Sequence, residues 1–177
     1  MSIEHICDEV ARIIKKYDET DPVELARAMK IILLYEALGD YDEACKGFYL
    51  YQSRKKIITI NSDLPRMIQR IILAHEIGHA VLHPQAARLH PFHDFSLYDS
   101  SSRYEYEANL FAAEYLLKDE SVFEALNDDK FFFAAARELC VPAELLDFKF
   151  RILKRKGYKI TDPPLMANSD FLKNINK

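Results

Sequence analysis

The chain has 177 residues, of which 49% are hydrophobic and 29% are charged, and its net charge is −4. This length is enough for one domain with a hydrophobic core, alone or with a small extension. The composition excludes disordered and fibrous proteins. The acidic balance argues against sequence-independent binding of nucleic acid, which requires a basic surface.

The N-terminal residues show neither the basic start nor the apolar run of a signal peptide. No apolar run is long enough to span a membrane. The three cysteines, Cys7, Cys45 and Cys140, are far apart and form no CxxC pair. We expect reduced thiols that pack as small apolar residues, in a cytoplasmic protein.

The first third of the chain predicts two helices followed by three strands. Apolar residues recur at helical spacing over residues 3–17, and Asp21 with Pro22 is typical of the start of a second helix. Three later segments are short, rich in β-branched or aromatic residues, and bounded by Gly, Asp, Asn or charged residues. These predicted strands are KIILLYEA (30–37), KGFYLYQ (46–52) and KKIITIN (55–61).

The rest of the chain is predicted to be mainly helical. A long helix from Leu64 to His83, capped by the segment 61–63, ends at a proline. Residues 84–102 contain two prolines and a serine run without periodicity, which indicates a loop. A helix over residues 103–118 follows, and two more helices are separated at Val141-Pro142.

The predicted long helix contains His75, Glu76 and His79 in an HExxH pattern. On a helix the two histidines lie one turn apart on one face, and the glutamate stays beside them. Two neutral imidazoles at this spacing suit Zn²⁺, and the carboxylate can take a proton from a water that the metal activates. The simpler alternative is a chance match, with the histidines satisfied inside an ordinary core.

Apolar residues cover most sides of this helix, so the imidazoles are expected to be buried, where polar groups need partners. A metal ion would satisfy them. His83 lies one turn beyond His79, but three histidines on consecutive turns of a straight helix splay too far for one tetrahedral ion. We therefore predict a hydrogen-bonding or packing role for His83.

A catalytic zinc site needs a third protein ligand. The metzincin pattern requires glycine at position 82 and histidine at position 85, and the chain has Leu82 and Gln85 there, which excludes that class. The remaining common solution is a glutamate from a second helix. The helix predicted over residues 103–118 offers Glu105, Glu107 and Glu114.

Helical geometry separates these candidates. At about 100° per residue, Glu105 shares a face with alanines and with Asn109. Glu107 falls on the opposite side with Glu114 and Lys118, in a charged stripe that is expected to face solvent. An acid on an apolar face needs a partner, so Glu105 is predicted as the third ligand, with Glu107 as the alternative. Asn109 is predicted to orient Glu105 or a backbone group.

Three segments, GFYLYQSRKKIITIN, QRIILAHEIGHAVLH and EYEANLFAAEYLL, occur in this order and resemble the ImmA/IrrE metallopeptidases over roughly residues 22–155. The resemblance implies an α+β, gluzincin-like (zincin) fold in which a three-stranded sheet packs on the HExxH helix and a second ligand-bearing helix. It implies His75, His79 and Glu105 as zinc ligands and Glu76 as the catalytic base. It also implies site-specific cleavage of a helix-turn-helix repressor, which would derepress a mobile element or stress genes.

On this basis we expect a metallopeptidase domain over residues 1–118, a helical, helix-turn-helix-like module over 119–160, and a flexible tail over 161–177. The later segment AARELCVPAELLDFKFRIL resembles the short helical module that often closes these proteins. An extended substrate is expected to pair with an edge strand, supplied by GFYLYQ or KKIITIN.

An oxyanion partner is also needed. The candidates lie in or beside the predicted loop: His90, His93, Tyr98 and Tyr104.

Two other functions compete with proteolysis. One is a metal-containing module that sequesters or remodels a transcription regulator without cleaving it. The other is direct DNA binding by the basic C-terminal end, which we do not expect, because basic residues that close a helix are usually solvated and favour its macrodipole. These residues are Lys149, Arg151, Lys154, Arg155, Lys156 and Lys159.

Overall fold

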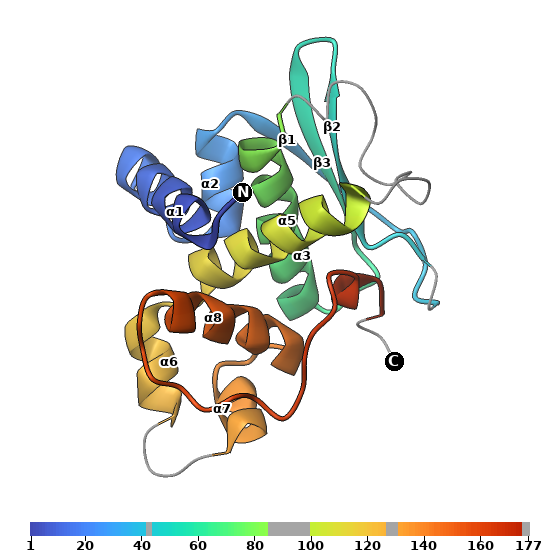
Figure 1. Ribbon diagram of the computed structural model, residues 1–177. Coiled ribbons are helices and arrows are strands. Elements are labelled where there is room, and N and C mark those ends of the chain that lie inside the picture. Colours follow the sequence, from blue (N-terminus) through green and yellow to red (C-terminus); the bar gives the residue numbers. More distant parts are fainter. Residues whose placement is uncertain (42–43, 85–99, 127–130, 175–177) are drawn as a thin grey trace.

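Capping residues set the start of the first two helices in the computed structural model, which describes residues 1–41, 44–84, 100–126 and 131–174. The Ser2 hydroxyl accepts the backbone N–H of His5 and begins α1 (Ile3–Tyr17). Asp21 accepts two backbone N–H groups and begins α2 (Pro22–Ala28), with its proline in the first turn as predicted. α1 packs against α5 (Ser100–Leu116), and α2 packs against α3 (Arg66–Leu82) and β1 (Ile31–Glu36). In Figure 1 both helices lie to the left of α3 and α5.

The three predicted strands form one mixed sheet, which confirms the α+β class. β1 (Ile31–Glu36) pairs in parallel with β3 (Lys55–Asn61), and β2 (Gly47–Gln52) pairs antiparallel with β3. The strand order is β1-β3-β2. Since KKIITIN is the central strand, it cannot supply a free edge for a substrate. Among the described strands, only β1 and β2 have an open edge.

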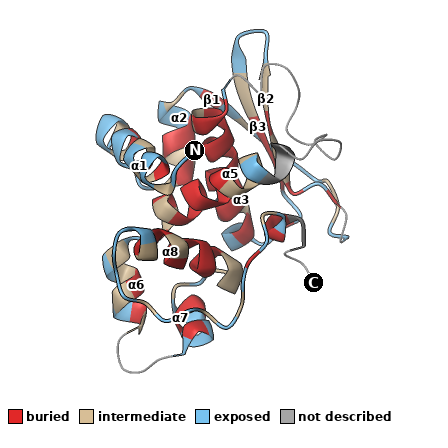
Figure 2. Ribbon diagram, in the orientation of Figure 1, coloured by how far each residue is buried: buried red, intermediate tan, exposed pale blue. Residues whose placement is uncertain are grey.

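α3 (Arg66–Leu82) carries the HExxH pattern and packs on the sheet through β2 and β3. It is buried along nearly its whole length (Figure 2). The prediction that Asn61 helps to cap this helix is wrong, because no side chain caps it. The Asn61 amide instead donates to the carbonyls of Gly39 (2.7 Å) and Cys45 (2.9 Å). The backbone carbonyls of an irregular segment have no helix or strand partners. A side-chain amide has two N–H donors, so it can satisfy two such carbonyls.

α5 (Ser100–Leu116) crosses α3 at close range. The approach is set by Gly78, where a Cβ atom would lie 3.2 Å from the Cβ of Phe111 and 3.3 Å from the carbonyl oxygen of Ala108. Small residues on both helices therefore bring the backbone of α5 towards the HExxH helix.

Gly78→Val is expected to destabilise the protein by about 1–3 kcal/mol, because the added side chain must push α5 away from α3. The free energy of unfolding from urea titration measures this effect. Met67→Val is the matched control, since it places the same β-branched residue at an exposed position of α3, where a change below about 0.5 kcal/mol is expected. Equal losses in the two variants would show that the helix crossing tolerates extra volume.

The C-terminal helices are α6 (Asp119–Leu126), α7 (Phe132–Glu138) and α8 (Ala143–Arg155). The break between α7 and α8 falls at the predicted Val141-Pro142, whereas α6 was not predicted. α8 packs against α5, and Figure 1 shows α6 and α7 on the far side of α8 from the sheet.

The expectation that the basic residues of this region are all solvated is wrong for Lys149, which is 1% exposed. Its ammonium group contacts Glu114 at 2.6 Å and Asp119 at 2.5 Å. These acids come from α5 and α6, so the buried charge joins three helices. Arg151 and Lys156 also form ion pairs, with Asp147 and with the same two acids.

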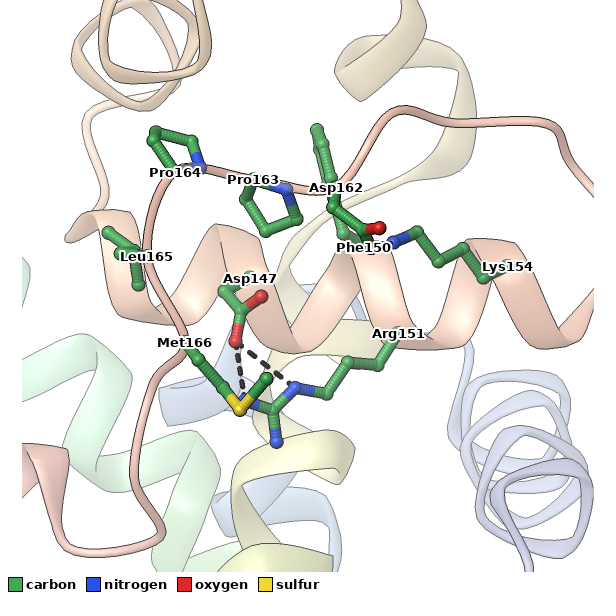
Figure 3. Close-up of a pocket in the computed structure, with 9 residues that line it drawn as sticks. All are labelled: Asp147, Phe150, Arg151, Lys154, Asp162, Pro163, Pro164, Leu165 and Met166. Carbon is green, nitrogen blue, oxygen red and sulfur yellow. Dashed lines mark hydrogen bonds and ion pairs between the residues drawn. The ribbon is translucent and has the colours of Figure 1, made fainter.

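Residues 161–172, where we expected a flexible tail, lie along α8 (Figure 3). The backbone N–H of Ala167 donates to Asp147, and Arg151 donates to the Ala167 carbonyl at 2.7 Å. The ring of Phe171, in the 3-10 turn η2 (Phe171–Asn174), packs on Phe148. Three apolar side chains, Ala167, Phe171 and Leu172, are buried, and their burial offsets the entropy lost by ordering the segment.

The cysteines are free thiols, but Cys45 and Cys140 are exposed, so the expectation that all three pack in the core is wrong. Within the described ranges, the helices lack the combination of length and apolar character that crossing a membrane requires.

Candidate metal centre

The two histidines of the HExxH pattern project from one face of α3 into the contact with α5. His75 and His79 are 4% and 1% exposed, and their Nε2 atoms lie 3.0 Å apart. The one-turn spacing brings the two nitrogens to a common point, and the apolar residues around the rest of α3 keep that point away from solvent. The arrangement predicted for these two side chains is thus present.

Of the glutamates on α5, Glu105 is the one beside both imidazoles. Its carboxylate oxygens lie 3.1 Å from Nε2 of His75 and 3.4 Å from Nε2 of His79. The ligand atoms of His75, His79 and Glu105 all lie within 4.8 Å of one another, so this group could hold a metal ion.

The alternative ligand, Glu107, lies elsewhere. It is 3% exposed, and its carboxylate contacts His83 rather than His75 or His79. The expectation that Glu107 and Glu114 form a solvent-facing stripe is therefore wrong. The reason is that α5 is covered on that side too, by α1 and α8. Each acid there has a cationic or hydrogen-bonding partner, as buried carboxylates require.

The outer nitrogen of His75 is held by Asn109. Its Nδ1 lies 2.8 Å from Oδ1 of Asn109, and the Asn109 amide nitrogen donates to the carbonyl of Ser169 at 2.6 Å. The Ser169 contact assigns the amide nitrogen, so the oxygen must face His75, and Nδ1 of His75 must carry the proton. Asn109 was predicted to orient Glu105 or a backbone group; it holds the backbone carbonyl of Ser169, and the side chain that it orients is His75 rather than Glu105. No pattern in the sequence points to Ser169, whose contribution is a backbone carbonyl.

His83 makes hydrogen bonds at both ring nitrogens. Its Nδ1 lies 3.2 Å from Nδ1 of His79, and its Nε2 lies 2.9 Å from Oε2 of Glu107. The other oxygen of Glu107 accepts from Arg103 at 3.0 Å and contacts the amino group of Met1. Burial and the neighbouring His79 lower the pKa of His83 to about 4.

Glu76 lies next to the cluster, with one oxygen engaged and one not. Its carboxylate accepts the backbone N–H of Tyr49 in β2. Its Oε2 is buried without a hydrogen-bond partner among the described residues. Burial raises the pKa of Glu76 to about 7, and the negative Glu105 adds to this effect while His75 opposes it. A carboxylate whose pKa is near neutrality is well suited to proton transfer.

The pKa values of the three clustered side chains move in different directions. Burial favours neutral His75, but the hydrogen bond and negative charge of Glu105 outweigh it and raise the pKa of His75. In His79 burial prevails and lowers the pKa. Burial would raise the pKa of Glu105, but its close contacts with both imidazoles lower it. The cluster is therefore built around an ionised carboxylate.

The donor set fits a metal ion. With its proton on Nδ1, neutral His75 directs the lone pair of Nε2 at a carboxylate oxygen and at a second imidazole nitrogen. Electron-pair donors this close repel unless a proton or a cation lies among them. A proton on His75 satisfies only part of the cluster, whereas one cation satisfies all three groups. Two imidazoles and a carboxylate are the ligands of many catalytic zinc sites.

The candidate oxyanion residues are placed only in part. His90, His93 and Tyr98 lie outside the described residues. Tyr104 is half-buried, and its ring centroid lies 4.6 Å from that of His83. It therefore packs on the outer part of the cluster.

Comparison with known proteins identifies the family. The model of the IrrE N-terminal-like domain matches residues 26–151. Immunity region protein 2 of Bacillus phage phi105 is 39% identical over 140 residues, which is 79% of this chain and 85% of the phage protein. Metallopeptidase ImmA of Bacillus subtilis is 28% identical over 128 residues, which is 67% of this chain and 66% of that protein. The matched region contains both helices of the cluster, and the chain therefore belongs to the ImmA/IrrE family.

Proposed function

We propose that this protein is a zinc-dependent, site-specific endopeptidase that cleaves a helix-turn-helix repressor in the cytoplasm. One observation carries the proposal: two histidines and Glu105 converge beside a glutamate with an unengaged, buried carboxylate oxygen. A purely structural cluster would have no use for that oxygen, because burying a carboxylate without a partner costs stability.

His75, His79 and Glu105 would hold the zinc ion, which when bound supplies the Lewis acidity that lowers the pKa of a water molecule. Oε2 of Glu76 takes the proton as the water attacks the peptide carbonyl. The same carboxylic acid then returns the proton to the departing amine nitrogen. Asn109 and the buried surroundings hold His75 in one orientation while this occurs.

The substrate backbone is proposed to pair with the open edge of β2. The backbone N–H of Tyr49 is directed at Glu76 rather than at β3, so this edge borders the base. An extended peptide that adds to β2 would pass its carbonyl groups beside the cluster. The other open edge belongs to β1, which is separated from β2 by the central strand β3.

The names of two relatives support the proposed substrate class. One is named for a phage immunity region, and another is the metallopeptidase ImmA. In a phage immunity region, the regulatory protein for a peptidase to remove is a phage-type repressor. Cleavage of that repressor would derepress the mobile element.

The test is incubation of the purified protein with a phage-type helix-turn-helix repressor from the same genome. We expect two fragments with one defined new N-terminus, determined by mass spectrometry. A chelator should stop their formation, and added zinc should restore it. A stable complex with uncut repressor would instead support the competing function, a metal-containing module that sequesters its partner.

A further inference from the structure

We infer that His83 and Glu107 are positioning residues of the metal centre, which act through His79. This inference rests on the proposed metal site and adds two residues to it. The chain of contacts runs from Glu107 Oε2 to His83 Nε2 at 2.9 Å, and from His83 Nδ1 to His79 Nδ1 at 3.2 Å. It ends at Nε2 of His79, which faces His75 and Glu105.

The two contacts determine where the protons lie. Glu107 accepts a hydrogen bond from the protonated Nε2 of His83, because a carboxylate and an unprotonated nitrogen cannot form a hydrogen bond. Two N–H groups cannot point at each other, so only one of the two facing Nδ1 atoms carries a proton. With the proton of neutral His83 on Nε2, its Nδ1 accepts, and His79 donates from Nδ1.

This arrangement leaves the lone pair of His79 Nε2 directed at the cluster, which is the state that can bind a metal. The opposite arrangement would put the proton of His79 on Nε2 and block it. Glu107 and His83 thus do for His79 what Asn109 does for His75.

A packing role alone does not account for these two side chains. His83 and Glu107 are 5% and 3% exposed, and they are brought together from positions 24 residues apart. Burying an imidazole and a carboxylate is costly, and apolar side chains of similar size would fill the same space at lower cost. Arg103 holds the second oxygen of Glu107, so both oxygens of the carboxylate are directed.

The test measures zinc affinity by competition with a chromophoric chelator. His83→Phe is expected to weaken zinc binding about 10- to 100-fold, the loss typical of outer partners of a metal ligand. Glu107→Ala is expected to weaken it by about tenfold. In the double variant, Glu107→Ala should add nothing to His83→Phe, because the carboxylate acts only through His83. His83→Gln should recover most of the affinity, since an amide can both accept from His79 and donate to Glu107.

Glu114→Gln is the matched control. It removes a largely buried carboxylate from the same helix, but its partners are Lys149 and Lys156 rather than the cluster. We expect its zinc affinity to equal that of the wild type. A second readout is the ¹⁵N spectrum of the His79 ring in the metal-free protein, where the Nδ1–H form should dominate and should decline in His83→Phe.

Three outcomes would overturn the inference: unchanged zinc affinity in folded His83→Phe, unchanged affinity in Glu107→Ala, or additive losses in the double variant. If His83→Phe does not fold, Glu107→Ala decides alone. Failure of the wild-type protein to bind zinc would instead refute the proposed function. A wild type that binds zinc, with variants that bind equally well, would refute only the role of His83 and Glu107.

Discussion

Replacement of Glu76 by glutamine is expected to reduce repressor cleavage by at least about 10²- to 10⁴-fold, the usual contribution of a general base. The amide keeps the size of the side chain and can still accept the N–H of Tyr49, so the fold should be retained. It cannot take a proton from water, and since it is not one of the three clustered ligands, bound zinc should remain near one ion per chain.

The measurement combines the cleavage rate with the zinc content of the same sample. Glu124→Gln, on the exposed surface of α6, removes the same charge far along the chain and should retain full activity. Cleavage by Glu76→Gln at the wild-type rate would remove Glu76 from the mechanism. Loss of zinc together with activity would mean that Glu76 supports the ligands rather than the reaction.

Glu105→Ala is expected to weaken zinc binding by more than about 100-fold, beyond the loss that outer partners produce. It removes the carboxylate of the group His75, His79 and Glu105, and it leaves two imidazoles as the only ligands of that group. Activity should fall with the metal content. Chelator competition again gives the affinity, and far-UV circular dichroism verifies the fold.

Comparison with Glu107→Ala decides between the two glutamates of the sequence prediction. The contacts place Glu105 at the imidazoles and Glu107 one histidine further out, so the first variant should lose more affinity. The reverse order would make Glu107 the ligand, and it would require α5 to turn about its axis when metal binds.

Local patterns in the sequence predicted the elements that carry the site. The three strands and the HExxH helix follow from short-range periodicity and from residues that start or stop an element, and they lie where expected. The helical angle also placed Glu105 on the face that meets α3. These features are set by residues that are close together in the sequence. There the intrinsic propensity and the pattern of apolar residues favour the same element.

The errors arose where the outcome depends on distant segments. On a helical wheel, Glu107 and Glu114 cannot be distinguished from a solvated stripe, because their partners are His83, at the end of α3, and Lys149 of α8. Asn61 is a residue type that often caps helices, yet its amide donates to the carbonyls of Gly39 and Cys45, and its oxygen accepts the N–H groups of Leu38 and Asp63, all of which lie outside the helix. In each case the polar side chain meets a partner that only the tertiary structure supplies.

The contact between Asn109 and Ser169 has a consequence for biosynthesis. The amide that orients His75 is itself held by a carbonyl 60 residues further along the chain. While the protein is being translated, the HExxH helix leaves the ribosome long before that carbonyl does. We therefore expect a nascent chain to bind metal poorly and to become competent only when residues 161–172 dock on α8. Synthesis itself would then delay proteolysis until the segment that contains Ser169 has been made.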